Sequence, residues 1–301
     1  MLVYLMQKKS TRDLHIEIAN KTMSYIYQNI DTPINIDELA VDFGVSKIHL
    51  HKIFKEQLGI NIYESIKSIR LQKASNLLLT NKYSTITQIA NMCGYSSQSS
   101  FIKAFKKRFE QTPKEWRRGG YENYSSRILE NSLLLDSMPS FDESKVRITK
   151  TIDRTIYYIR QKGYIVEEGK QKWQQLQVWI YTNDLKDYEQ IGIYHDNPAI
   201  TPHEECFYTA AISPNNKSKI LNTNLPSNTL RGGLYATFDI YKGDREVGWF
   251  IKWAYHKWLP QSGFETTTDP SFVIMHKNHF LEENEIDATF YFPIRNPYTF
   301  N

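Results

Sequence analysis

The sequence predicts a multidomain protein, in which an all-α double helix-turn-helix domain is followed by an α+β domain. Three observations lead to this class. A helical pattern occurs twice in the first 120 residues, short β-branched and aromatic runs dominate after residue 143, and charge divides unevenly between the halves. Residues 1–120 carry 18 Lys and Arg against 10 Asp and Glu, a net charge of +8, whereas residues 121–301 carry 19 against 23, a net charge of −4. We therefore expect domains over 1–120 and 143–301, joined by a linker over 121–142.

The N-terminal half contains an internal repeat. Residues 35–55 and 85–106 match at an offset of fifty, with one residue inserted in the later part of the second copy. The matched positions are Ile36, Leu39, Ala40, Gly44 and Ser46 in the first copy and Ile86, Ile89, Ala90, Gly94 and Ser96 in the second. Each copy predicts a helix, a tight turn at the glycine and a second helix. Two helix-turn-helix units are expected.

Capping patterns predict where the helices begin. Three pairs have the spacing of a capping box: Asn35 with Glu38, Thr85 with Gln88, and Asn61 with Glu64. The last pair opens an amphipathic helix over residues 62–79, which would be roughly 27 Å long. A helix of that length is of the right order to hold two units near the roughly 34 Å that separates successive major grooves on one face of DNA.

The second helix of each copy has an apolar face and a basic, polar face. Phe101, Phe105 and Phe109 recur at the period of one helix face. The residues expected to point outward are Ile48, Lys52 and Lys55 in the first copy and Ser99, Lys103 and Lys106 in the second. Such a face offers cations to phosphates and guanine edges, polar groups to other bases and an apolar group to a thymine methyl. It indicates a helix that reads the major groove; the alternative for a lone helix is a solvated charged face.

The N-terminal turns of these helices complete the predicted DNA-binding set. A recognition helix reaches furthest into the groove with its first residues. The full set is Ser46, Lys47, Ile48, His51, Lys52, Lys55, Ser97, Gln98, Ser99, Lys103 and Lys106. For the serines that precede the helix, the alternative role is helix capping.

Residues 12–118 resemble the AraC/XylS family of bacterial transcription regulators. The resemblance rests on both repeat copies, the central "RLQKASNLLL" and the closing "TPKEWRR". It implies base contacts from Ile48, His51 and Lys52 in the first unit and from Gln98, Ser99 and Lys103 in the second. Two features depart from the family. Glu110 stands where glycine is frequent, and lysines 52 and 103 replace arginines, so they offer a point charge without a bidentate fork.

The C-terminal half alternates strand and helix patterns. The expected strands lie in residues 145–152, 155–163, 188–196, 206–213, 234–241, 271–276 and 287–294. Two stretches have helical spacing instead, 167–181 and 245–259. The order is strands, helix and two strands, followed by strand, helix and two strands. This predicts an antiparallel sheet with two helices and an internal pseudo-repeat.

Residues 145–296 resemble the GyrI-like effector-binding domain, most specifically in "WLPQSGFE". The resemblance implies a pocket between the pseudo-repeats, lined by Tyr157, Tyr194, Phe207, Tyr235, Trp249, Trp253, Phe264 and Val273. The alternative is that these rings are ordinary core. Val273 stands where cation-binding relatives place a buried glutamate, which puts a cation preference in doubt. The candidate carboxylates to replace it are Glu205, Asp239 and Glu265.

These observations predict a transcription regulator that responds to a small aromatic or lipophilic effector. The expected partners are double-stranded DNA over two adjacent major grooves, the effector and RNA polymerase. The alternatives are an activator whose C-terminal half serves protein–protein contact, and a GyrI-like hydrolase tethered to DNA. The sequence has no nucleophile–base pattern, metal-ligand spacing or phosphate-binding loop, so we expect no catalysis, metal or cofactor. Two unpaired cysteines and no apolar run of membrane length predict a cytoplasmic protein.

Overall fold

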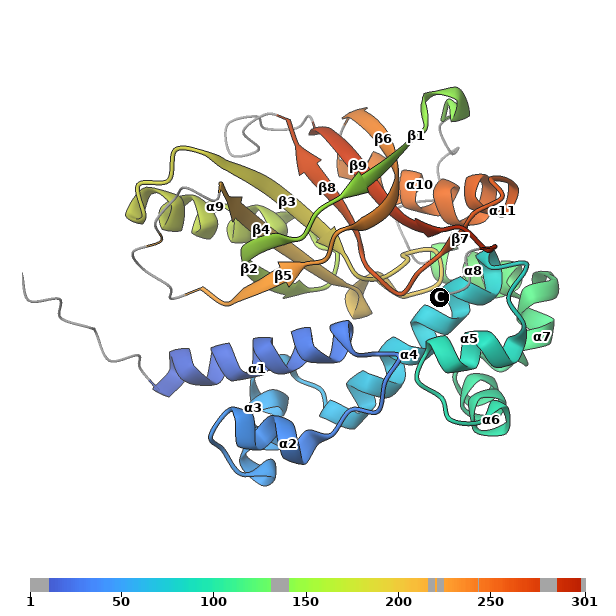
Figure 1. Cartoon of the computed structure of the whole chain (residues 1–301), viewed down its shortest axis with the longest axis horizontal. Coiled ribbons are helices and arrows are strands. Elements are labelled where there is room, and N and C mark those ends of the chain that lie inside the picture. Colours follow the sequence, from blue (N-terminus) through green and yellow to red (C-terminus); the bar gives the residue numbers. More distant parts are fainter. Residues whose placement is uncertain are drawn as a thin grey trace, which may run out of the picture.

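The N-terminal half is helical and lies against one face of a C-terminal antiparallel sheet (Figure 1). The computed structural model describes residues 11–130, 141–215, 220, 225–242, 244–276 and 286–298. The predicted fold class, with a helical first half and an antiparallel α+β second half, is confirmed. The predicted linker lies partly outside the described residues.

The two predicted helix-turn-helix units are present. The helices of this half are α1 (Thr11–Gln28), α2 (Ile36–Asp42), α3 (Lys47–Leu58), α4 (Ile62–Thr80), α5 (Ile86–Met92), α6 (Gln98–Phe109), α7 (Pro113–Glu115), the π-helical turn η1 (Trp116–Gly120) and α8 (Tyr121–Glu130). Helices α2 and α3 form the first unit, α5 and α6 form the second, and α4 joins them. Helix α8 begins just after the predicted boundary at residue 120, and its Tyr124 ring lies 5.3 Å from that of Trp116 and 5.4 Å from that of Phe109.

The capping predictions succeed in part. Thr85 and Gln88 form a complete capping box, with both reciprocal hydrogen bonds. The Asn35 side chain accepts hydrogen bonds from the backbone amides of Asp37 and Glu38 at the start of α2. The reciprocal bond from the Glu38 side chain, which would complete the box, is not formed. The capping box predicted for Asn61 and Glu64 is wrong. The Asn61 side chain donates from Nδ2 to Glu64 Oε2 at 2.9 Å and makes no hydrogen bond to the backbone at the start of α4.

The turn glycines adopt the left-handed backbone that the repeat predicts. Gly44 has φ 65° and Gly94 has φ 70°. They differ in surroundings: a Cβ at Gly44 would meet open space, whereas one at Gly94 would clash with the carbonyl oxygen of Ile30. The C-terminal caps of the two recognition helices are also equivalent, with Gly59 at φ 72° after α3 and Glu110 at φ 61° after α6. A glutamate in this conformation is strained.

The apolar ridge of α6 anchors the second unit. Phe101, Phe105 and Phe109 are fully buried. The Trp116 ring packs against the last two at centroid distances of 5.6 and 4.8 Å, and its Nε1 donates to Ser75 O at 3.0 Å. The basic side of α6 is therefore held outward by a rigid aromatic cluster.

The C-terminal half is one antiparallel sheet with the strand order β1-β6-β9-β8-β3-β4-β2-β5, with β7 paired to β9. The strands are β1 (Arg147–Thr151), β2 (Arg154–Lys162), β3 (Tyr188–Tyr194), β4 (Phe207–Pro214), β5 (Ser227–Leu230), β6 (Gly233–Lys242), β7 (Glu265–Thr266), β8 (Ser271–Met275) and β9 (Ile286–Arg295). All seven predicted strands are present; the short β5 and β7 were not predicted. The helical elements are η2 (Glu143–Lys145), α9 (Val166–Thr182), η3 (His203–Glu205), α10 (Asp244–Trp253), η4 (Ala254–Trp258) and α11 (Leu259–Gln261).

The two copies of the pseudo-repeat meet at the centre of the sheet. The two copies are β2–α9–β3–β4 and β6–α10–β8–β9, and the pairing of β3 with β8 joins them, with Gly192 opposite Val273. Helices α9 and α10 pack on one face. The other face carries Tyr158, Tyr235 and Phe272 and turns toward α1. The sheet is thus covered on both sides.

Candidate nucleic-acid interface and effector domain

Helix α3 presents the first predicted reading surface. Ile48 is 83% exposed, and Lys52 and Lys55 are also exposed. His51 is half-buried because its ring lies 5.3 Å from that of Tyr63, at the start of α4. An exposed apolar side chain on a recognition helix can meet a thymine methyl. Tyr63, itself 56% exposed, is a neighbour that sequence reasoning missed.

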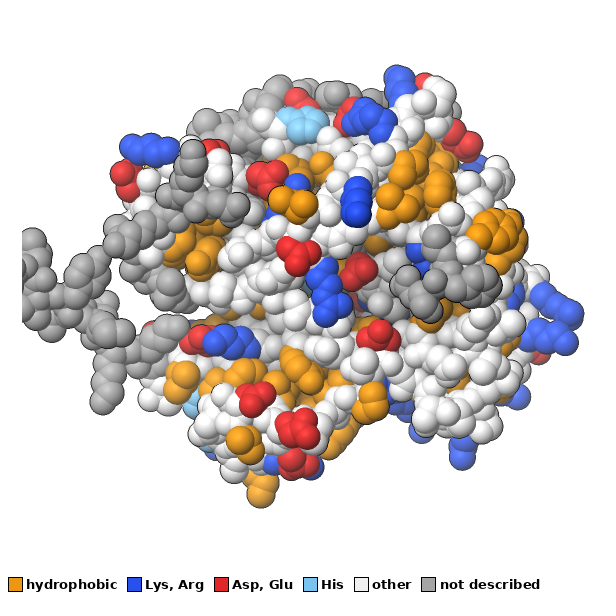
Figure 2. Space-filling model, in the orientation of Figure 1, with side chains coloured by type: hydrophobic (Ala, Val, Ile, Leu, Met, Phe, Trp, Pro, Cys, Tyr) orange, Lys and Arg blue, Asp and Glu red, His pale blue; other side chains and the backbone are white. Residues whose placement is uncertain are grey.

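Helix α6 presents the second surface in the equivalent orientation. Ser99, Lys103 and Lys106 are exposed, as is Gln98. The amide oxygen of Gln98 accepts from Thr87 Oγ1 at 3.0 Å, which fixes this side chain against α5. Figure 2 shows Lys and Arg side chains gathered around the end of the N-terminal half where α6 lies. The structure therefore brings the predicted residues of each unit together on one helix.

Several predicted DNA-binding residues besides Gln98 have partners within their unit. Ser46 accepts from His49 N at 3.2 Å and Ser97 accepts from Ser100 N at 3.3 Å, so both cap their helices. Lys47 bonds Asp37 at 2.8 Å, and this hydrogen bond raises the pKa of Lys47. Their capping and pairing position the outward residues.

The residues predicted for the effector pocket divide between the two faces of the sheet. On the face that carries α9 and α10 lie Tyr157, Tyr194, Trp253, Phe264 and Val273. Trp249, on α10, has the Lys252 ammonium 5.0 Å from its ring centroid. Tyr235 lies on the opposite face, and Phe207 packs with the apolar cluster of the first helix-turn-helix unit. The structure thus does not bring all eight residues together.

The centre of the helix-bearing face is closely packed. The Tyr194 and Tyr208 rings lie 5.3 Å apart, and Trp173 Nε1 donates to the Tyr208 hydroxyl at 3.1 Å. A Cβ at Gly192 would lie 2.7 Å from that hydroxyl and 3.0 Å from Val273 Cγ2. Glycine at this position lets the tyrosine fill the space beside Val273.

The three carboxylates considered as replacements at position 273 are engaged elsewhere. Glu205 pairs with Arg108 at 2.6 Å, and Asp239 pairs with Arg147 at 2.8 Å. Glu265 contacts the helical half of the chain. Among the described residues, no group of three or more His, Cys, Asp and Glu could hold a metal ion, and none of the described helices is long and apolar enough to cross a membrane.

Comparison with known proteins identifies both halves. Residues 39–119 match the family described as a helix-turn-helix domain, and residues 144–295, half of the chain, match the GyrI-like small molecule binding domain. The chain belongs to the GyrI-like family and carries an AraC-type helix-turn-helix domain. The probable transcription factor PqrA of Proteus vulgaris is 41% identical over 87 residues, which cover 29% of this chain and 70% of PqrA.

Two other relatives match over a smaller share of their own length than PqrA does. The xylose operon regulatory protein of Escherichia coli K12 is 36% identical over 117 residues, which are 38% of this chain and 30% of that protein. The lactose operon transcription activator of Staphylococcus xylosus is 30% identical over 122 residues, 38% of this chain and 43% of that protein. The matches thus span less than half of these two relatives.

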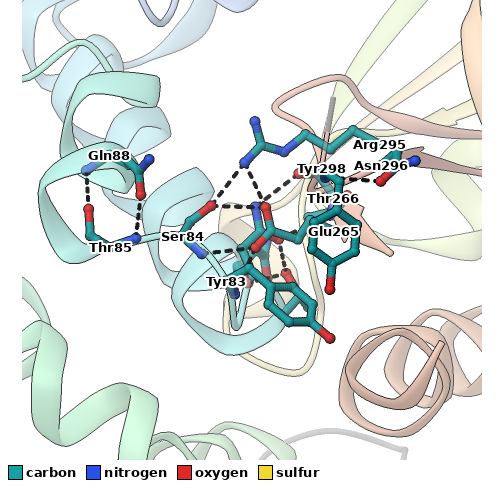
Figure 3. A network of polar contacts seen from close by, with 12 residues as sticks. Tyr83, Ser84, Thr85, Gln88, Glu265, Thr266, Arg295, Asn296 and Tyr298 are labelled. Atoms are coloured by element: carbon teal, nitrogen blue, oxygen red, sulfur yellow. Dashed lines mark hydrogen bonds and ion pairs between the residues drawn. The ribbon is translucent and has the colours of Figure 1, made fainter. Parts of the chain in front are cut away.

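A buried ionic network links the two domains of the chain (Figure 3). Glu265 on β7 is 1% exposed and pairs with Arg295 on β9 at 2.6 Å. The same carboxylate accepts from the backbone amides of Tyr83 and Ser84, both at 3.0 Å, and from Ser84 Oγ at 2.9 Å. Thr85 follows at once and caps α5. The GyrI-like domain therefore holds the loop that opens the second helix-turn-helix unit.

A second set of contacts joins α4 to the loop after β3. Lys73 Nζ donates to His195 O at 3.2 Å, and Asn197 Nδ2 donates to Asn76 Oδ1 at 3.0 Å. Burial lowers the pKa of Lys73 and raises that of Asp196 to about 6. Buried ionisable groups of this kind are costly, so the contact favours one defined arrangement of the two domains.

Two cavities lie at this junction. The smaller, about 60 Å³, lies between α1 and the sheet and is lined by Tyr27, Tyr158 and Tyr235 among others. The larger, about 400 Å³, lies between α4, α6 and the end of β4 where Phe207 stands. The predicted pocket residues Tyr235 and Phe207 thus line junction cavities.

Proposed function

We propose that this chain is a ligand-responsive transcription regulator that reads two adjacent major grooves with α3 and α6. The observation that carries the proposal is the equivalence of the two outward faces, Ile48, Lys52 and Lys55 on α3 and Ser99, Lys103 and Lys106 on α6. Both helices belong to one chain and are joined through α4. One molecule would then cover two half-sites without dimerising.

Each outward residue has a role suited to its chemistry. The lysines at 52, 55, 103 and 106 neutralise phosphates or donate to guanine. Ile48 meets a thymine methyl, and His51, Gln98 and Ser99 bond to base edges. Ser46, Lys47 and Ser97 act indirectly by holding the first turn of each helix in position.

The effector site of the proposal is the helix-bearing face of the GyrI-like domain, around Tyr157, Tyr194, Trp253, Phe264 and Val273, with Trp249 at α10. Apolar burial at about 25 cal/mol per Å² and ring stacking would supply the affinity. Tyr208 fills the centre of this face, so it must move to admit a ligand. Because the candidate carboxylates Glu205, Asp239 and Glu265 are engaged elsewhere, we propose a neutral aromatic or lipophilic effector.

The response to the effector passes to DNA through Glu265 in this proposal. That residue lies four positions after the end of α11 and holds the loop before α5. The resulting complex acts in the cytoplasm through RNA polymerase, in keeping with the activator named among the relatives. The packed aromatic face is also compatible with the alternative in which this domain serves protein–protein contact.

DNA selection tests the reading proposal. Bound fragments are selected from random DNA, and one is footprinted with the full chain. We expect one molecule to protect two adjacent major grooves. Lys52→Ala and Lys103→Ala should each lower the salt slope of binding by about 0.9 per phosphate contact removed. Lys150→Ala, an exposed lysine on β1, is the matched control. Unchanged slopes for both recognition-helix variants would exclude this docking face.

Ligand titration tests the effector proposal. Val273→Glu places a carboxylate beside Tyr208 and should create a preference for a quaternary cation over its neutral isostere, whereas the parent chain should favour the cation by no more than about thirtyfold through cation–π attraction. Binding of each compound to the parent chain and to the variant is followed by the tryptophan fluorescence of the full chain. If neither compound binds, the protein–protein alternative gains support.

A further inference from the structure

The larger junction cavity has the chemistry of a ligand site that is separate from the aromatic face. Its volume of about 400 Å³ falls in the range of small-molecule pockets. Helix α4 supplies the floor, α6 one wall, and the C-terminal domain the other wall through Lys162, Glu205 and Phe207. Sites at domain interfaces are a common place for ligands.

The surface of this cavity is apolar in its depth and basic at its rim. Met23, Ile69 and Leu71 are buried side chains that line it, and Phe207 joins them. Four cationic side chains line it as well, against two carboxylates: Lys67, Lys107, Arg108 and Lys162 against Glu64 and Glu205. The excess of positive charge favours an anion, and the apolar residues favour a ligand with a hydrocarbon body.

Two buried polar atoms in the lining have unused hydrogen-bonding capacity. Ser65 is 2% exposed, and its Oγ has no hydrogen-bond partner among the described residues. Arg108 bonds Glu205 through Nη2 at 2.6 Å, but its Nε is buried and has no partner in the described part of the chain. Buried polar groups are rarely left unsatisfied, because the loss of hydration costs free energy. Solvent reaches neither of these two atoms, so a bound anionic group would meet Arg108 through the exposed part of its side chain, which is 32% exposed.

We propose that this junction cavity binds a small amphipathic organic acid, whose carboxylate or sulfonate meets Arg108 while its apolar body lies against Phe207 and α4. Glu205 competes with the ligand for the same guanidinium. Because Ala104 and Lys107 of α6 also line the cavity, the ligand contacts the helix that carries the second DNA-reading face. This proposal does not depend on the proposed DNA-reading function, since binding of the ligand is measured in the absence of DNA.

A pair of naphthalene probes tests the charge requirement on the full chain. The anionic probe is 8-anilinonaphthalene-1-sulfonate, and the neutral probe is N-phenyl-1-naphthylamine, which lacks the sulfonate. We expect saturable binding of one anionic probe per chain, at least about tenfold tighter than the neutral probe, as for a hydrogen bond to a charged group. Equal affinity for the two probes, or no saturable binding, would overturn the proposal.

Substitutions in the lining test the location. Ala104→Trp on the α6 wall and Ser68→Trp on the α4 floor each fill the cavity and should weaken the anionic probe at least about tenfold. Ser126→Trp, at an exposed position of α8, is the matched control. Circular dichroism checks folding, and the two blocking variants are independent of each other. Unchanged binding in a folded blocking variant would place the probe elsewhere and refute the site.

Opposite charge changes distinguish a ligand contact from a structural role. Arg108→Gln should abolish the preference for the anionic probe, whereas Glu205→Gln should strengthen anion binding about threefold or more because it frees the guanidinium. A merely structural ion pair predicts that both variants weaken binding. That result would contradict the proposed contact.

Discussion

Glu265→Gln is the sharpest test of the coupling between the two domains. The wild-type carboxylate accepts four hydrogen bonds, from the amides of Tyr83 and Ser84, from Ser84 Oγ and from Arg295. A glutamine keeps the shape but has one acceptor oxygen, so its NH2 group must face either the guanidinium or the loop amides. Hydrogen bonds to charged groups contribute about 1.5–3 kcal/mol each. We expect the opening free energy of the loop to fall by about 3 kcal/mol.

Hydrogen exchange of the peptide over residues 81–86 measures this change. A fall of about 3 kcal/mol accelerates exchange by roughly 150-fold, since about 1.4 kcal/mol corresponds to a factor of ten. Glu189→Gln is the control, because Glu189 pairs with Arg154 at 2.8 Å but is 42% exposed. An exposed pair contributes about 1 kcal/mol or less. If exchange over residues 81–86 does not change in Glu265→Gln, the network does not hold the loop and the proposed route to DNA fails.

Four further substitutions test backbone strain and buried charge. Glu110→Gly should raise the free energy of unfolding by about 1 kcal/mol in urea denaturation, because φ 61° strains any residue with a Cβ; a loss would show that the side chain has a contact that outweighs the strain. Gly94→Ala should cost at least about 1 kcal/mol more than Gly44→Ala, since only the first Cβ meets the carbonyl oxygen of Ile30; equal costs would refute that clash. Asp196 has a pKa of about 6 when folded against about 3.9 unfolded, so the folded chain binds more protons and the free energy of unfolding should fall by about 3 kcal/mol between about pH 4 and pH 6. Asp196→Asn should flatten that profile, and an unchanged profile would assign the titration to another group.

The helical half could be predicted because its constraints are local and occur twice. The glycines at 44 and 94 require a left-handed backbone, and the phenylalanines of α6 define its buried face, so pattern and structure agree. Where spacing leaves two outcomes open, the prediction failed. Asn61 has capping-box spacing, but its amide can donate to Glu64 as well as accept from the backbone, and the structure takes the first option.

The effector domain was less predictable because its sheet is covered on both faces. Successive side chains of a strand then point to two buried faces, so apolar and polar residues do not alternate as they do when one face is exposed. The sequence therefore gave no means to separate Tyr235 and Phe207, which face the DNA-binding half, from Tyr157 and Tyr194, which face the helices. The short β5 and β7 are too brief to alternate.

The contacts between the two domains could not be predicted from the sequence. Glu265 lies 181 residues from Ser84, and neither residue belongs to a motif that specifies the other. The conspicuous stretch "WLPQSGFE" ends at this glutamate, and its resemblance pointed to a pocket within the C-terminal domain. Only the folded arrangement shows that the carboxylate turns toward the helix-turn-helix unit.

Helix α4 has a consequence for how operators are recognised. Residues 65 and 66, and every residue from 71 to 80, are buried, because both the DNA-binding units and the C-terminal domain pack around the helix. A helix enclosed in this way cannot bend freely, so it holds the two helix-turn-helix units at one separation, and a shift of the C-terminal domain would move both units together. Neighbouring base pairs are about 3.4 Å apart along a strand. Under the proposed reading mode, an operator whose half-sites lie one base pair closer together or further apart would therefore bind more weakly, with or without a ligand.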